Sequence, residues 1–195
     1  MKNVLILLFS IIVLSCNKKD KKTITMQKPY IISLEDEKIK KEIDSINKTR
    51  KKGIIAFPRK GFYYENHLII DKNNFVYYYQ REYIPILCNY GKEKHTLPEF
   101  INLKPKYVVN ISKDNIEEIV REKVLKKEKG KQILIIASQN DTIKDRKFLR
   151  FLKNIKVPIY IIRRTTQEED TVLHYMRTNK YYNSDKIKWD KKRID

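Results

Sequence analysis

Apolar residues between positions 114 and 178 follow two different periods, and the alternation of these periods predicts an order of elements. Apolar positions three and four residues apart predict helices, whereas short unbroken apolar runs predict strands that are covered on both faces. The predicted order is helix, strand, helix, strand and helix. The helices centre on residues 116–124, 148–152 and 172–176, and the strands centre on 133–137 and 157–162. Because a strand, a crossover helix and a second strand of one sheet almost always form a right-handed unit, we expect the two strands to be parallel.

Polar residues at the ends of these segments predict where the helices begin and end. Asp114 and Thr166 each have a glutamate three positions later, which is the spacing of a capping box. The second helix is expected to begin at Asp141, and Gly130 is expected to end the first. Residues 179–195 are mostly polar and are expected to form a packed or partly frayed tail.

The N-terminal half begins with a helix pattern and continues with strand patterns. A helix is expected from Ser33 to about Gly53, with Ile39, Ile43 and Ile46 on one face. So thin an apolar stripe predicts a helix that packs on a surface. From residue 54 the period changes to two, which predicts strands. These strands are expected at 54–57, 62–64, 67–70, 75–79 and 107–111, with an irregular segment at 81–106.

The strands 67–70 and 75–79 are expected to form a hairpin, because the Asp-Lys-Asn-Asn sequence between them favours a tight turn. Tyr78 must then face away from Tyr77 and Tyr79. One of these faces should be core, and a tyrosine face that stacks on sugars is the alternative. The sequence therefore predicts an α/β (α+β) fold. In it, an N-terminal helix and a β-hairpin region precede an α-β-α-β-α unit with a parallel strand pair in one mixed sheet.

The first residues of the chain have the pattern of an export signal. Lys2 is followed by an apolar run from Val4 to Leu14, which is shorter than the roughly 20 residues that cross a bilayer. The run ends in Val-Leu-Ser-Cys, which resembles the lipobox of bacterial lipoproteins. The resemblance implies that Cys16 receives fatty acyl chains such as palmitate and becomes the first residue of the mature protein. An ordinary signal cut elsewhere, or an uncleaved core helix, is the alternative.

Residues 17–23 are almost entirely polar and contain four lysines. A segment with so little apolar surface predicts a flexible tether, and basic residues beside a lipid anchor each contribute about 1 kcal/mol at an anionic membrane. Asn17 is not the aspartate that retains lipoproteins at the inner membrane. We therefore expect a protein anchored on the periplasmic side of a Gram-negative membrane, the outer one in preference to the inner.

Composition is consistent with one folded domain behind this tether. We expect a signal peptide at 1–15, the lipidated cysteine and basic tether at 16–30, a single α/β domain at 31–178 and the tail at 179–195. With Cys16 acylated, Cys88 has no partner for an internal disulfide, and its apolar surroundings predict a buried thiol. The net charge of +19 invites a nucleic-acid hypothesis. Lysines spread along the whole chain and an exported location argue against nucleic acid as a partner.

Three parts of the chain together resemble a known protein family. They are the hairpin at 68–79, the helix and strand at 115–138, and the helix and strand at 145–162. Together they are similar to the periplasmic domain of the ExbD/TolR family. These small envelope proteins couple inner-membrane proton motors to the outer envelope. The resemblance covers about half of the mature chain and implies a fold and an envelope-binding role. It does not extend to proton coupling, because the N-terminal apolar segment carries no acidic residue and about 25 residues are inserted after the hairpin.

Residues with recognisable chemistry are sparse. The three histidines are far apart, so no metal site is expected, and no phosphate-binding loop, nucleophile elbow or other catalytic motif points to a cofactor. In open α/β sheets, however, ligands bind beyond the carboxyl ends of the strands. Candidates for an anion or ligand site there are Asp141, Arg163, Arg164 and Thr166. Alternatively, Asp141 and Thr166 only cap helices, and the arginines pair with Glu168 or Asp170.

Two functions from different classes are compatible with these features. The first is a non-catalytic binding or adaptor lipoprotein whose partner is an envelope protein or an anionic polymer such as peptidoglycan. The second is a tethered envelope hydrolase in which Asp141, Asp145 and Arg163 supply an acid, a base or an anion clamp. The hydrolase requires at least two carboxylates in one pocket, and the adaptor requires none.

Overall fold

The fold is built on a five-stranded mixed sheet. A computed structural model describes residues 28–49, 64–81 and 103–190. The sheet has the order β4-β3-β2-β5-β7, with antiparallel pairing from β4 to β2 and parallel pairing from β2 to β7. Its strands are β2 (Asn66–Ile70), β3 (Val76–Gln80), β4 (Val109–Ile111), β5 (Ile133–Ser138) and β7 (Ile159–Arg164). The predicted α+β class and its parallel pair are confirmed, and β2 adds a third parallel strand.

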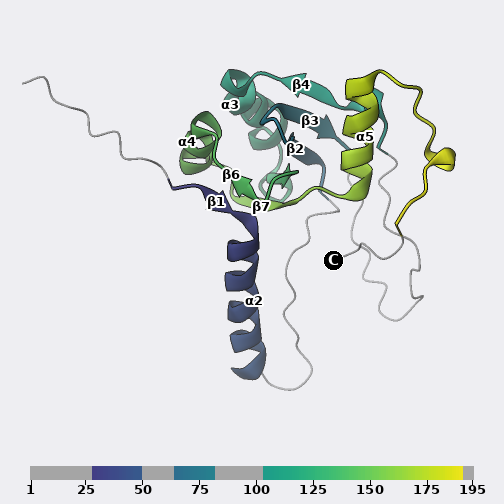
Figure 1. Cartoon of the computed structure of the whole chain (residues 1–195). Helices are drawn as coiled ribbons and strands as arrows, with labels where there is room; N and C mark the ends of the chain where they lie inside the picture. The colour runs from purple at the N-terminus through teal and green to yellow at the C-terminus, as the bar shows by residue number, and fades with distance from the viewer. Residues whose placement is uncertain (1–27, 50–63, 82–102, 191–195) are drawn as a thin grey trace, which may run out of the picture.

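Helices cover both faces of this sheet, as Figure 1 shows. On one face lie α3 (Ile116–Val120), which continues as a π-helical turn (η3, Arg121–Leu125), and α4 (Arg146–Asn154). On the other face lies α5 (Gln167–Thr178). Short 3₁₀ turns complete the fold at Pro105–Tyr107 (η1), Lys113–Asn115 (η2), Lys129–Lys131 (η4) and Ser184–Lys186 (η5).

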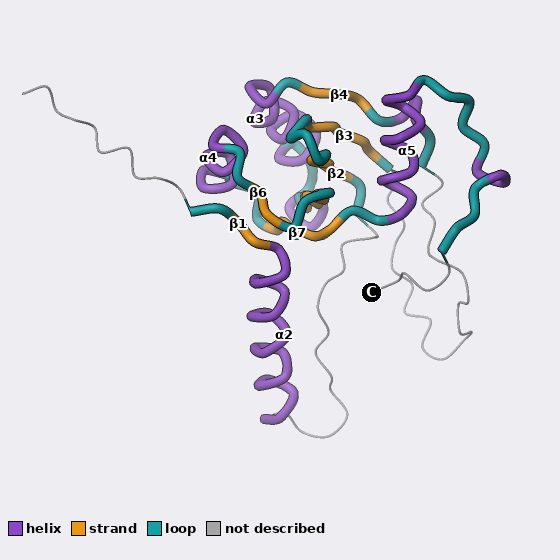
Figure 2. The backbone as a smooth tube through the Cα atoms, in the orientation of Figure 1, coloured by secondary structure: helices purple, strands orange, loops and turns teal. Residues whose placement is uncertain are grey.

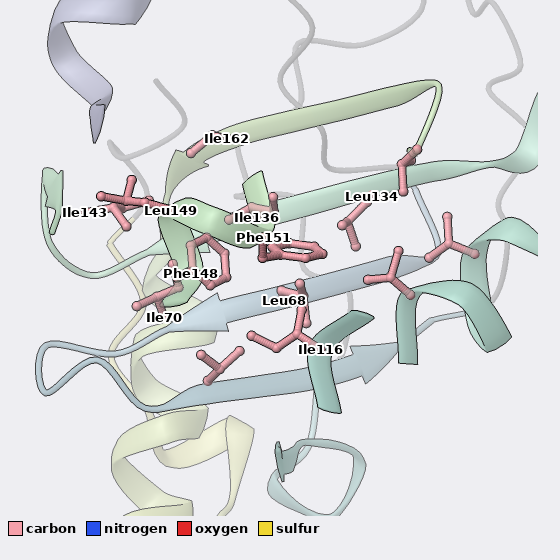
Figure 3. Close-up of a cluster of buried hydrophobic side chains, with 14 of the residues drawn as sticks. Leu68, Ile70, Ile116, Leu134, Ile136, Ile143, Phe148, Leu149, Phe151 and Ile162 are labelled. Carbon is pink, nitrogen blue, oxygen red and sulfur yellow. The ribbon is translucent and has the colours of Figure 1, made fainter. Parts of the chain in front are cut away.

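The larger core lies between the sheet and the pair α3 and α4. Figure 3 shows Phe148 and Phe151 of α4 beside strand residues such as Leu68 and Ile136. The phenylalanine rings contact each other with centroids 5.5 Å apart. The smaller core packs Val172 and Leu173 of α5 against the opposite face. Burial on both faces explains why β5 is an unbroken apolar run.

Tyrosines of β3 contribute to both cores, because side chains alternate along a strand. Tyr77 and Tyr79 are buried on the α5 face, and Tyr78 packs against the larger core while its hydroxyl donates to Asn66 Oδ1 (2.7 Å). The predicted alternation is therefore confirmed. Neither face presents a row of tyrosines to solvent, so the sugar-stacking alternative is wrong.

The second helix of the C-terminal half begins later than Asp141. Residues Thr142–Ile143 (β6) instead pair antiparallel with Tyr30–Ile31 (β1) and form a small separate sheet. The helix begins at Arg146, where the Asp145 carboxylate accepts from Phe148 N (2.9 Å). The expected start was wrong because its residues take a non-local strand partner.

The first helix of this half also differs at both ends. Ser112, and not Asp114, supplies a side-chain acceptor, and it does so at the start of η2, the 3₁₀ turn that leads into α3. Helical turns end at Leu125, and the side chain of Gln132 donates to the carbonyls of Leu125 and Lys127. Gly130 lies beyond this end in η4. The side chain of Gln132 therefore caps the C-terminal end of this helix, where Gly130 was expected to end it.

The N-terminal helix α2 (Ile32–Thr49) projects away from the body of the molecule, as the tube in Figure 2 shows. Ile32 is buried (1% exposed), whereas Ile39 and Ile46 are 44% and 41% exposed. The predicted helix is present, but only its first turn is embedded among the described residues.

Several predictions fall outside the described residues. They are the signal at 1–15, Cys16 and most of the tether, the strand at 54–57, most of the strand at 62–64, Cys88 and most of the irregular segment 81–106. Among the helices of the described ranges, none is both long and apolar enough to span a bilayer.

Candidate functional site at the carboxyl ends of the parallel strands

The three parallel strands β2, β5 and β7 end at one edge of the sheet, and the candidate residues follow these ends. Arg163 and Arg164 close β7, and Thr166 precedes α5. Asp141 lies between β5 and β6. The chain thus places all four candidates along the edge, as the sheet topology predicts.

Asp141 is bonded to the start of α2. Its carboxylate accepts from Ser33 N (3.0 Å) and Ser33 Oγ (2.7 Å), and its carbonyl accepts from Ile32 N (2.9 Å). The hydrogen bonds from Ser33 lower the pKa of Asp141, so the carboxylate is ionised at neutral pH. Asp141 therefore occupies the anion-binding position at a helix N-terminus with the chain's own charge. The helix that it caps is α2, and α4 is capped by Asp145.

Thr166 forms the capping box that the sequence predicts. Its hydroxyl accepts from Glu169 N (3.1 Å), and Glu169 Oε2 accepts from Thr166 N (2.8 Å). The N-terminus of α5, like that of α2, is filled by a carboxylate of the protein.

Arg163 holds Glu169 in a bidentate ion pair. Its two terminal nitrogens lie 2.7 Å and 2.9 Å from the two carboxylate oxygens. Glu169 is 0% exposed. Burial raises the pKa of Glu169, but the charge and hydrogen bonds of Arg163 outweigh this effect and lower the pKa to about 2. For Arg163, the partners offered as the alternative, Glu168 and Asp170, are replaced by the residue between them, whereas Arg164 donates to the carbonyl of Gln139.

Two residues that the sequence analysis did not single out complete this buried cluster. Tyr79 donates from its hydroxyl to Glu169 Oε1 (2.7 Å), and the His67 ring stacks on Tyr79 with centroids 4.4 Å apart. His67 Nε2 lies 2.6 Å from the carbonyl of Tyr64, so this nitrogen carries the proton. Burial, with the nearby charge of Arg163, lowers the pKa of His67 to about 3. The imidazole is therefore neutral at physiological pH.

A histidine inside an otherwise apolar strand was the available signal for this cluster. His67 begins the run His-Leu-Ile-Ile and is fully buried, and a buried polar ring requires polar neighbours. The identity of those neighbours was not predictable. Tyr79 and Glu169 are 90 positions apart in sequence and meet only through the fold.

The remaining polar groups of the edge bind one another. Gln139 accepts from Lys72 N (3.0 Å) and donates to Asp170 (2.8 Å), and Arg164 donates to the carbonyl of Gln139. The buried carboxylate of Asp71 accepts from the backbone of the hairpin turn, at Asn73 N (2.8 Å) and Phe75 N (2.9 Å). The candidate residues of the edge are therefore all bonded to other groups of the chain, although among the described residues His67 Nδ1 has no hydrogen-bond partner.

Asp141 and Asp145 are bonded to different helices. Asp141 binds Ser33 of α2, whereas Asp145 caps α4 and pairs with Lys113. A shallow hollow of about 400 Å³ beside the hairpin contains Lys113 and Lys147, which are paired with Asp145 and Asp114. Within the described ranges, no three His, Cys, Asp or Glu side chains cluster as metal ligands.

The side chains at the strand ends stabilise the fold by bonding to one another and to the backbone, and they present few reactive groups. Asp141 and Glu169 are ionised and hydrogen-bonded, His67 is neutral and enclosed, and Arg163 is mostly covered by its neighbours. Comparisons of the chain with family models, curated proteins and solved structures found no match.

Proposed function

We propose that this protein is a lipid-anchored, non-catalytic binding or adaptor module of the cell envelope, held at the periplasmic side of a membrane by an acylated Cys16. The single observation that supports a binding role is that the candidate residues at the strand ends are bonded to the protein itself. Asp141, Arg163 and Thr166 are each bonded to groups of the chain itself. A non-catalytic binding role does not require any of these three side chains to be available to a ligand.

The energetic cost of opening this network strengthens the argument. Removing one partner of a buried ion pair costs about 3–5 kcal/mol, because the other charge is left desolvated. A substrate would have to displace Glu169 from Arg163, Tyr79 and the Thr166 backbone before it could reach the arginine. Recognition by the outer surface carries no such cost.

The outer surface suits an anionic partner. The chain carries 43 lysines and arginines against 24 acidic residues, so its exposed side chains attract negative charge. Peptidoglycan or an acidic envelope protein has the complementary charge. The resemblance of residues 13–16 to a lipobox supports an envelope location for this partner.

A binding experiment with a salt titration tests the adaptor function. The protein is purified in mild detergent from membranes of cells that produce it, immobilised, and incubated with peptidoglycan sacculi and with solubilised envelope proteins. Because the Debye length shortens from about 10 Å at 0.1 M salt to about 3 Å at 1 M, we expect bound material to be released between these concentrations.

Two outcomes would count against this function. Soluble sugar or peptide fragments released from sacculi by the wild type, but not by an Asp141→Asn variant, would indicate a hydrolase. Absence of any retained envelope component at about 0.1 M salt would exclude charge-driven docking.

A further inference from the structure

The exposed side of α4 carries a row of cations. Arg146, Arg150 and Lys153 occupy positions i, i+4 and i+7, so they form one stripe along the helix, and all three are exposed. The opposite side buries Phe148 and Phe151 in the larger core. The core contacts hold α4 in place and fix the direction in which this cationic stripe faces.

Acidic side chains pair with some of the other exposed cations but not with this stripe. Lys126 pairs with Glu122, and Lys131 pairs with Glu128. Across residues 142–166 the only acidic residue is Asp145, which pairs with Lys113 and caps α4. In the part of the chain that the structure describes, no carboxylate forms an ion pair with the stripe. Exposed Lys144 and Lys156 extend its charge at both ends.

The stripe lies beside the point at which the chain enters the fold. Tyr30 of β1 pairs with Ile143 of β6, and α4 begins three residues after Ile143. Figure 1 shows β1, β6 and α4 on one side of the molecule, with α5 on the other. However it is arranged, the segment 17–27 spans at most about 40 Å. An anchor at Cys16 therefore holds the chain just before β1 within about 40 Å of the bilayer, and α4 begins beside β1.

We infer that the cationic stripe of α4 (Arg146, Arg150 and Lys153) docks the domain on the anionic surface of the bilayer that holds Cys16, an inference that rests on the proposed lipid anchor. Guanidinium groups bind lipid phosphates bidentately, and basic residues next to a lipid anchor strengthen membrane contact. Docking through α4 orients the domain, because α5 covers the opposite face of the sheet and points away from the lipid.

Amine footprinting of the whole protein tests this orientation. Protein extracted from membranes of producing cells is reconstituted into vesicles of phosphatidylcholine alone, or with about 30% phosphatidylglycerol, and acetylated briefly before mass spectrometry. Lys153 and Lys156 report on the α4 side, and exposed Lys180, after α5, reports on the far side. On the anionic vesicles we expect acetylation of Lys153 and Lys156 to fall roughly fivefold, with Lys180 unchanged and the effect lost at about 0.5 M salt.

A pair of matched variants links the protection to the stripe. Arg146→Gln/Arg150→Gln removes two exposed helical charges from α4, and Lys40→Gln/Lys41→Gln removes two from the projecting α2. Glutamine favours a helix about as well as arginine and lysine do, so both variants should fold. The α4 variant should lose the protection, and the α2 variant should keep it.

Flotation of the vesicles separates the docking surface from the anchor. Protein that floats with both lipids, yet shows equal acetylation of Lys153 and Lys156 on both, would overturn the docking inference and leave the anchor intact. Protection that persists in the α4 variant, or that extends equally to Lys180, would overturn it as well. Failure to float with either lipid would contradict the anchor itself.

Discussion

At the scale of single residues, the fully buried Glu169 is held by several hydrogen bonds. It accepts from Arg163, from the Tyr79 hydroxyl and from the backbone of Thr166, and it is fully buried. The sequence predicted only its bond to Thr166, because capping boxes are local. Arg163 of β7 is only six positions away, but Tyr79 of β3 is 90 positions away and no residue pattern specifies it.

Glu169→Gln is therefore expected to destabilise the protein by about 3–5 kcal/mol, because the Arg163 charge stays buried without its carboxylate. Tyr79→Phe should cost about 1.5–3 kcal/mol, the range for a hydrogen bond to a charged group. Urea unfolding monitored by circular dichroism measures both. Tyr160→Phe, at a position 44% exposed, is the matched control and should change the free energy of unfolding by less than about 0.5 kcal/mol. Equal effects of the two tyrosine variants would contradict the assigned role of Tyr79.

Acid should destabilise the protein from an unusually high pH. The folded pKa of His67 is about 3, mainly because of burial, and that of Glu169 is about 2. In the unfolded chain these groups titrate near about 6.5 and 4.3, so the unfolded state binds more protons at acidic pH. The free energy of unfolding is greatest above about pH 6.5. Below that pH it declines toward pH 3, because His67 takes up a proton in the unfolded chain but not in the folded one. Between about pH 4.5 and 2 the same effect at Glu169 lowers it further.

Urea unfolding at a series of pH values measures this dependence. Each group contributes a slope of up to about 1.4 kcal/mol per pH unit within its window. In a His67→Gln variant the decline should start only near about pH 4.5, where the carboxylates begin to titrate. A wild-type stability that is flat from pH 7 to 5 would show that His67 is charged or accessible in the folded state.

At the scale of elements, local patterns predicted which segments are helices and strands better than where they end. The start of α5 was correct because Thr166 and Glu169 lie within one turn. The start of α4 was wrong because Thr142–Ile143 pairs with β1, which lies more than a hundred positions away. The end of the α3 segment was wrong because the side chain of Gln132 caps it. Non-local partners thus decide the boundaries.

The helix α2 gives a second test at this scale, because its apolar residues are unequally buried. Ile32 is 1% exposed and belongs to the larger core, whereas Ile39 is 44% exposed. Ile32→Ala should cost about 2–5 kcal/mol, through lost burial and a cavity. Ile39→Ala should cost less than about 1 kcal/mol. Thermal and urea unfolding of the two variants compare them directly, and a large loss for Ile39→Ala would mean that the stripe of α2 is covered in the native protein.

At the scale of the whole molecule, the sequence predicted the α+β class, the hairpin and the parallel pair of β5 and β7. It did not predict that β2 would join the parallel set, or that β1 and β6 would form a second sheet, because both follow from pairings between distant segments. The candidate residues were predicted to lie at one edge and do so. Apart from the capping box of Thr166 and Glu169, their bonding partners were not predictable, because these depend on side-chain geometry.

The proposed place of this protein in the envelope depends on Cys16, whose acylation would hold the cationic domain at a membrane. The most direct test is the intact mass and N-terminal peptide of the native protein, extracted from membranes of the cells that make it. The account predicts a chain that begins at Cys16 and carries fatty acyl groups, and a Cys16→Ser variant that is neither cut there nor acylated. A native chain with a free Met1, or one cut at another bond without acylation, would contradict the account.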